Sequence, residues 1–141
     1  MRTSARNQFT GEIVRLTEGA VNDEIVLSTS GGLEIVAVIT RESTKSLGLA
    51  VGKPALGLVK ASSVMIMLDA RADQVSARNF VQGKVSAIQH GAVNSDVTIT
   101  SEGGSQISAI ITNASIQRLN LSVGVTAAAL FKASSVIIAV E

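Results

Sequence analysis

Most of this chain is one sequence written twice. A shift of 72 residues aligns residues 4–69 with 76–141 without a gap, and 28 of the 66 aligned positions are identical. A gapless match of this length indicates tandem duplication of one folding unit. We therefore expect two domains, at residues 1–69 and 76–141, joined by a short linker over residues 70–75.

The composition is too apolar for two such units to stand alone in water. Hydrophobic residues make up 46% of the 141 residues, and the mean hydropathy is +0.40. A unit of about 65 residues buries little surface by itself and is marginally stable. The surplus apolar surface has to be covered between halves or between subunits, so we expect a homo-oligomer.

Charge and residue usage exclude several classes of function. The net charge is +1, and the chain has three Phe but no Tyr, Trp or Cys. There is therefore no broad positive potential to attract nucleic acid or an anionic membrane, and there are few aromatic side chains on which bases could stack. Without Cys there is no thiolate metal site and no disulfide. The N-terminal residues form no apolar signal core, and no apolar run approaches membrane-helix length. We therefore expect a cytoplasmic protein without membrane or nucleic-acid partners.

The hydropathy pattern within each repeat is mostly that of β-strands. Alternating or continuous apolar runs predict strands at residues 9–17, 23–29, 33–40, 55–60 and 63–68 of the first repeat. Gly11 is expected to mark a bulge or bend, Ser30 to Gly32 a hairpin, and residues 42–47 a short helix capped by Thr40 or Ser43. This order predicts an all-β fold of two tandem OB-fold-like five-stranded β-barrels, each with one short helix.

The residues needed for catalysis or for binding a metal cation are missing. His90 is the only His, and the first repeat has Glu18 in its place. The acidic residues fall at strand starts or at alternating strand positions, where a solvated face explains them. No nucleophile elbow and no phosphate-binding loop is present. We therefore expect no enzyme, no catalytic cofactor and no direct coordination of a cation.

Two short phrases are preserved in both repeats, and they supply only hydrogen-bond donors. Ser-Ala-Arg-Asn begins at Ser4 and at Ser76, and Lys-Ala-Ser-Ser-Val begins at Lys60 and at Lys132. Other basic positions changed between the repeats; for example, Arg41 became Asn113. A site made only of donors complements a fully ionised tetrahedral anion. Sulfate, molybdate and tungstate fit this description, whereas phosphate still carries a proton near neutral pH.

At these residues the chain resembles the molybdate-binding Mop, or molbindin, family. The resemblance rests on Ser-Ala-Arg-Asn, Gly-Ala-Val-Asn, Ile-Thr-x-x-Ser and Lys-Ala-Ser-Ser-Val, each of which occurs in both repeats. It implies OB-like units that pair across subunits and hold molybdate or tungstate at interfaces. The Thr and Ser after the third strand would then come from a different unit than the Arg. The implied ligands are Ser4, Arg6, Thr40, Ser43, Lys60, Ala61, Ser62, Ser76, Arg78, Thr112, Ser115, Lys132, Ala133 and Ser134.

The resemblance also implies a homotrimer of two-unit chains. Six units would then surround a threefold axis, and two loops could form further oxyanion sites on that axis. These loops contain Gly19, Ala20, Val21 and Asn22 in the first repeat and Gly91, Ala92, Val93 and Asn94 in the second.

The leading prediction is an intracellular protein that binds molybdate or tungstate for storage and homeostasis of molybdenum. The alternative is an OB-type module that binds nucleic acid or an oligosaccharide. The neutral charge and the scarcity of aromatic residues argue against this alternative.

Overall fold

The apolar runs of the first repeat form four antiparallel strands in the computed structural model, which describes all 141 residues. The strands are β1 (Asn7–Thr17), β2 (Asn22–Thr29), β3 (Glu34–Thr40) and β4 (Pro54–Val59). A six-residue helix, α1 (Arg41–Ser46), separates β3 from β4, and the Thr40 side chain caps it as expected. The β2–β3 hairpin turns at Gly32, whose φ of 84° is left-handed.

The second repeat forms the same elements in the same order. They are β6 (Asn79–His90), β7 (Asn94–Ser101), β8 (Gln106–Thr112), α2 (Asn113–Leu119) and β9 (Thr126–Phe131). Thr112 caps α2 as Thr40 caps α1. The repeated pattern of residues therefore gives a repeated local structure.

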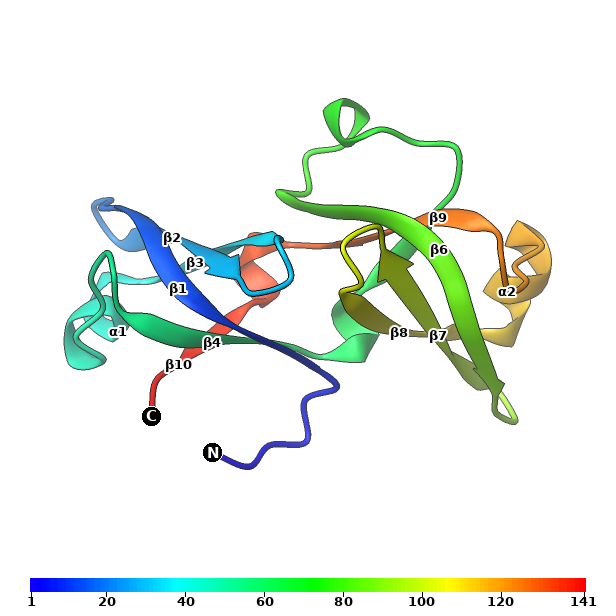
Figure 1. Cartoon of the computed structure of the whole chain (residues 1–141), viewed down its shortest axis with the longest axis horizontal. Coiled ribbons are helices and arrows are strands. Elements are labelled where there is room, and N and C mark those ends of the chain that lie inside the picture. Colours follow the sequence, from blue (N-terminus) through cyan, green and yellow to red (C-terminus); the bar gives the residue numbers. More distant parts are fainter. The chain divides into compact units, whose positions relative to one another are not determined.

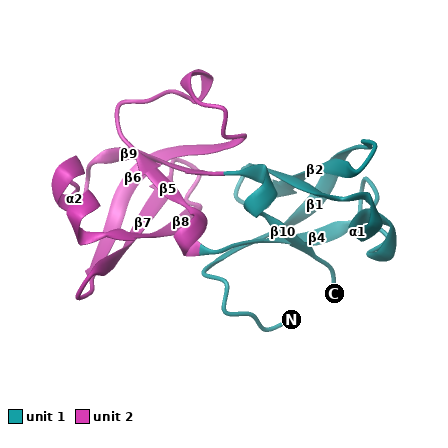
Figure 2. Cartoon of the chain, turned by 180° about the vertical axis from the view of Figure 1, so that it is seen from behind, with its two compact units in different colours: residues 1–60, 132–141 teal, residues 61–131 magenta.

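The fifth strand of each sheet comes from the other repeat (Figure 2). A 3₁₀ turn, Ala61–Ser63, leads into β5 (Met65–Met67), which pairs with β9 of the second repeat. The equivalent turn, Ala133–Ser135, leads into β10 (Ile137–Ala139), which pairs with β4 of the first repeat. The two sheets run in the orders β10-β4-β1-β2-β3 and β5-β9-β6-β7-β8.

This exchange moves the boundaries of the compact units away from those expected for the domains. One unit contains Met1–Lys60 with Lys132–Glu141, and the other contains Ala61–Phe131. The expected linker does not separate the units, because Ala72–Gln74 forms a 3₁₀ turn inside the second unit. The chain instead passes from one unit to the other after Lys60 and after Phe131.

Each sheet curls around an apolar core, as expected for an OB-like fold. In the first unit β10 and β3, the two edge strands, contact each other without sharing a hydrogen-bond ladder. Ala133 is buried against Val26 and Val36, so a residue of the second repeat completes the core of the first unit. β2 and β3 need this cover because both of their faces carry apolar side chains.

Gly11 lies in β1 at a point of close approach, and not at a bulge. The register with β2 shifts between Ile13 and Arg15, which places the bulge three residues later than the sequence predicted. A Cβ atom added at Gly11 would lie 2.2 Å from the Ser28 carbonyl oxygen. Gly83 in β6 is in the same position, 2.2 Å from the Thr100 carbonyl oxygen. Glycine at both sites lets the neighbouring strand approach closely.

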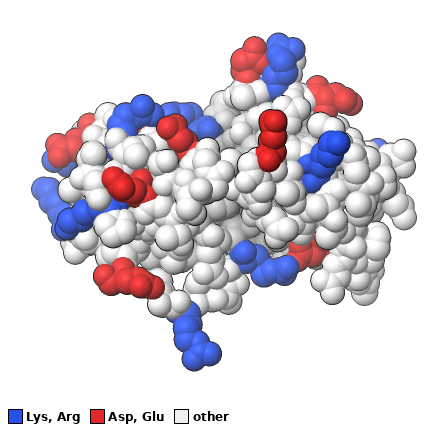
Figure 3. All heavy atoms as spheres, viewed as in Figure 1, with Lys and Arg blue, Asp and Glu red and all other residues white.

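No helix of the chain could span a membrane, and the face shown in Figure 3 carries charges of both signs. None of the helices has the length and apolar character required to cross a bilayer. Acidic and basic side chains are interspersed over each unit in the view of Figure 3.

Candidate oxyanion-binding site

The Arg and Lys of the two preserved phrases lie at the same end of a sheet. Asn7 pairs with Val59 at one end of the β1–β4 ladder. Arg6 precedes Asn7 and Lys60 follows Val59, and both side chains are exposed. We call this the arginine end, defined by Ser4, Arg6 and Lys60. In the second repeat Asn79 pairs with Phe131, so Ser76, Arg78 and Lys132 form the equivalent end.

The Thr and Ser that follow the third strand form a fixed pair of hydroxyl groups. The Thr40 Oγ1 accepts the Ser43 backbone N–H at 3.1 Å and donates to the Ser43 Oγ at 2.8 Å. Thr112 and Ser115 repeat both bonds, at 3.1 Å and 2.9 Å. Each pair is therefore held in one geometry before any anion arrives.

These hydroxyl groups share one end of the unit with the predicted axial loop. Thr40 pairs with Asn22, and the Arg41 backbone N–H donates to the Val21 carbonyl oxygen at 2.9 Å. We call this the turn end, and it comprises Gly19–Asn22 with Thr40 and Ser43. In the second unit it comprises Gly91–Asn94 with Thr112 and Ser115.

The arginine end and the turn end lie at opposite ends of a unit (Figure 1). β1, which runs from one to the other, has 11 residues. At about 3.3 Å per residue it spans roughly 30 Å or more, whereas a hydrogen bond reaches about 3 Å. Arg6 and Thr40 of one unit therefore cannot hold the same anion, and each end is only part of the predicted ligand set.

The Lys-Ala-Ser segments lie where the chain passes between units. Lys60 closes the first unit, whereas Ala61 and Ser62 belong to the second, where their 3₁₀ turn packs against β8. Ala133 and Ser134 pack against β3 of the first unit in the same way. Both alanines are buried, and Ser62 and Ser134 are exposed. The boundary between the units thus separates Lys60 from Ala61 and Ser62, whereas Lys132, Ala133 and Ser134 all belong to the first unit.

The turn of each unit is tight and depends on its glycine. A Cβ atom at Gly19 would lie 2.2 Å from the Asn22 carbonyl oxygen, and one at Gly91 would lie 2.3 Å from that of Asn94. Ala20, Val21 and Asn22 are exposed, and Val21 has 71% of its surface accessible. The turn therefore presents its backbone to the outside.

The sequence did not identify Arg41 as a residue that binds this turn. The Arg41 Nη1 donates to the Gly19 carbonyl oxygen at 3.0 Å. In the second unit the Asn113 Nδ2 donates to the Gly91 carbonyl oxygen at 2.9 Å. Arg41 and Asn113 therefore have the same structural role, because each side chain donates a hydrogen bond to the carbonyl oxygen of the turn glycine.

A second substitution accompanies this change and was the signal that could have revealed it. Asp23 and Ser95 occupy equivalent positions, and each is buried with 2% of its surface exposed. Ser95 donates through its Oγ to the Asn113 Oδ1, while Asp23 accepts the Gly19 backbone N–H at 3.0 Å. A charged pair in one repeat thus replaces a neutral pair in the other.

Asp23 is held in its ionised form by its surroundings. Burial by itself raises the pKa of this carboxyl group. Hydrogen bonds from Thr44 and Gly19 act in the opposite direction, as do the positive charges of Arg41 and Lys45. The balance lowers the pKa of Asp23 below its ordinary value of 3.8.

We expect this carboxylate to make the stability of the first unit dependent on acid pH. A group whose pKa is depressed by folding stabilises above its unfolded pKa, and this contribution is lost as the pH falls through the folded pKa. The free energy of unfolding of the parent should therefore fall more steeply below about pH 3.8 than that of Asp23→Asn. Urea unfolding between pH 2 and pH 6 measures this. Parallel curves for the two proteins would contradict it.

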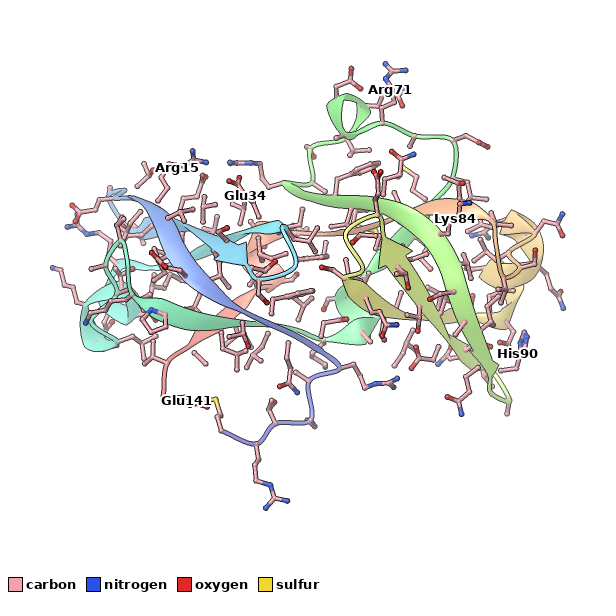
Figure 4. The ribbon with its side chains drawn as sticks, viewed as in Figure 1. Arg15, Glu34, Arg71, Lys84, His90 and Glu141 are labelled. Atoms are coloured by element: carbon pink, nitrogen blue, oxygen red, sulfur yellow. The ribbon has the colours of Figure 1, made fainter.

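His90 makes no site with other residues. It is the exposed last residue of β6, beside the turn of the second unit (Figure 4). No group of three or more His, Cys, Asp or Glu side chains is placed to hold a metal ion.

Comparisons with known proteins agree with this architecture. Residues 3–66 and 75–138 each match the model of the TOBE domain. The full chain is 42% identical to the molybdenum transport protein ModE of Herbaspirillum seropedicae and covers 52% of that protein. One repeat, 48% of the chain, is 40% identical to molybdenum-pterin-binding protein 2 of Clostridium pasteurianum and covers 98% of it. The chain spans about half the length of the two-repeat curated relatives it matches.

A solved structure matches the whole chain. It is that of ModG, a cytoplasmic molybdate-binding protein crystallised with molybdate bound. The TM-score is 0.94 and the sequence identity is 43%, with both chains covered in full. The resemblance to the molbindin family that the repeated phrases suggested is therefore confirmed.

Proposed function

This chain belongs to the TOBE domain family, with two copies of the domain in tandem, and from that premise we propose that it binds molybdate and tungstate. The role we propose is storage and homeostasis of molybdenum in the cytoplasm, without catalysis. The observation that carries this proposal is the full-length similarity to ModG, a protein solved with molybdate bound. The preserved donors of both repeats supply the matching chemistry.

We propose that each main site joins the arginine end of one unit to the turn-end hydroxyl pair of another. Two features support this arrangement. The opposite placement of Arg6 and Thr40 leaves each end with only half of the predicted ligands. Both halves are made of donors, namely a guanidinium group, an ammonium group and hydroxyl groups, so they suit one anion.

We propose that the full assembly is a homotrimer. Large apolar side chains are exposed at equivalent positions of the two repeats, which are Val21 and Val93, Val51 and Val123, and Met65 and Ile137. Val21 and Val93 lie in the turns themselves, so an interface that covers them also brings chains together at the turn ends. Three chains meeting there would place Gly19–Asn22 and Gly91–Asn94 on the threefold axis as further oxyanion sites.

Titration calorimetry of the purified protein with molybdate, tungstate, sulfate and phosphate tests the ligand. We expect strong heats with the first two anions and weak or no heat with phosphate, because a donor-only site has no acceptor for its proton. Sedimentation of the same samples should give the mass of three chains. Equal heats for all four anions would contradict the proposed selectivity, and a monomeric mass would contradict a site shared between chains.

The double variant Arg6→Ala/Arg78→Ala tests the arginine end. We expect it to lose molybdate binding at the main sites, because a charge-assisted bond to an anion contributes about 1.5 to 3 kcal/mol and each site loses its bidentate donor. Arg15→Ala is the matched control, since the second repeat already carries Ala87 at that position. Full stoichiometry in the double variant would show that these arginines are not ligands.

A further inference from the structure

In the turn of each unit one residue binds two carbonyl groups that would otherwise repel an anion. In the first unit Arg41 donates from its backbone N–H to the Val21 oxygen at 2.9 Å and from its Nη1 to the Gly19 oxygen at 3.0 Å. Asn113 does the same in the second unit, to the Val93 oxygen at 2.9 Å and from its Nδ2 to the Gly91 oxygen at 2.9 Å.

Two backbone N–H groups of the turn are left for an acceptor outside the unit. Ala20 and Val21 are exposed, and neither backbone N–H group makes a hydrogen bond inside the unit. The hydroxyl pair of Thr40 and Ser43 lies at the same end. With the Gly19 and Val21 oxygens occupied, the N–H groups of Ala20 and Val21 are available to an oxyanion, which needs such donors.

We propose that residue 41 in the first unit and residue 113 in the second are positioning residues, which bind two carbonyl oxygens of the turn and so leave its backbone N–H groups to bind an oxyanion. This inference rests on the proposed axial sites and identifies what prepares them. Asp23 and Ser95 are the supporting partners. Asp23 holds the Gly19 N–H and lies in the field of Arg41, and Ser95 holds the Asn113 amide.

The first unit has a charged pair, Asp23 and Arg41, and the second has a neutral pair, Ser95 and Asn113. We therefore expect one pair to replace the other only when both residues change together. Arg41→Asn alone deprives the buried Asp23 carboxylate of the larger of the two positive-charge effects that act on it, which are those of Arg41 and Lys45. Asp23→Ser alone leaves Arg41 with only Glu18, 3.6 Å away at the surface. The double variant Asp23→Ser/Arg41→Asn rebuilds in the first unit the neutral pair that the second unit already has.

The test is calorimetry with molybdate in the Arg6→Ala/Arg78→Ala background, where the sites left to measure are those of the turn ends. We expect Arg41→Ala to weaken the first-unit turn-end binding about tenfold or more, and Asn113→Ala to do the same in the second unit. Asp23→Ser/Arg41→Asn should restore the binding that Arg41→Ala loses, whereas a merely structural role predicts no such rescue of anion affinity.

Lys45→Gln is the control, since it removes a positive charge near the same turn and introduces the residue found at position 117. We expect unchanged binding, because Lys45 makes no bond to the turn. Equal losses in Lys45→Gln and Arg41→Ala would overturn the inference, and so would full affinity in Arg41→Ala. If the parent protein bound molybdate and the Arg6→Ala/Arg78→Ala variant bound none, the axial sites and this inference would be wrong. The proposed sites at the arginine ends would not be affected. No heat with the parent would overturn the proposed function itself.

Discussion

Ile138→Asp should unfold the first unit although the residue belongs to the second repeat. Ile138 pairs with Gly57 through β10 and is 6% exposed. The variant loses about 1.5 to 3 kcal/mol of apolar burial and places a carboxylate in the core, which adds several kcal/mol unless the group is neutralised. A unit of this size has only about 3 to 5 kcal/mol to lose. Hydrogen exchange read by residue should show protection lost across β1 to β4.

Ile137→Asp is the matched control for this experiment. Ile137 is the preceding residue of the same strand, but 60% of its surface is exposed. Its side chain lies outside the core of the unit, so its substitution should leave the protection of β1 to β4 in place, whatever its effect on the contacts that we propose between chains. In Ile138→Asp the second unit should keep its protection as well, because its fifth strand is β5. If Ile138→Asp instead exposed β6 to β9 and spared β1 to β4, β10 would not be exchanged between the repeats.

Gly11→Ala and Gly83→Ala should each destabilise their own sheet by about 2 to 3 kcal/mol or more. The new methyl group would lie 2.2 Å from a carbonyl oxygen of the neighbouring strand, and a backbone atom has no rotamer by which to move away. The two neighbouring strands would have to separate at that point. Thermal or urea unfolding of each variant measures the loss.

Gly57→Ala provides the comparison within the same sheet. Its added Cβ atom would meet the Leu27 Cδ2 at 3.3 Å, which is the end of a flexible side chain. We expect a cost of roughly 1 kcal/mol or less, because Leu27 can shift by a few tenths of an ångström. If the three variants were equally stable, close approach of the strands would not be the reason for glycine at positions 11 and 83.

Local features of the fold were predictable because they depend on residues close together in the chain. Alternating apolar residues predicted the strands to within about two residues, and Thr40 was expected as a helix cap because its hydroxyl reaches only three residues ahead. The composition of the candidate sites was readable for the same reason. Arg6, Lys60 and their counterparts stood out because a duplicated chain provides its own comparison.

The role of Arg41 was not predictable by that reasoning. In the sequence its replacement by Asn113 is one of several losses of a basic residue, because the sequence does not show that both side chains reach equivalent carbonyl groups. The bond joins residues 22 positions apart across the β1–β2 turn and the end of β3. The accompanying change from Asp23 to Ser95 is the one sign in the sequence that the two positions depend on each other. The folded geometry is needed to interpret it.

The sequence by itself determined the duplication, the strand order within each repeat and the donor chemistry of the preserved phrases. The tertiary structure decided where those phrases act. Ala-Ser-Ser-Val, which leads into β5 and β10, is identical in the two repeats, so this phrase does not determine which copy of the sheet each strand joins. The path of the chain after Lys60 and after Phe131 decides it, and each strand completes the sheet of the other repeat. The length of β1 then separates Arg6 from Thr40, so one unit cannot bring the whole predicted ligand set to one anion.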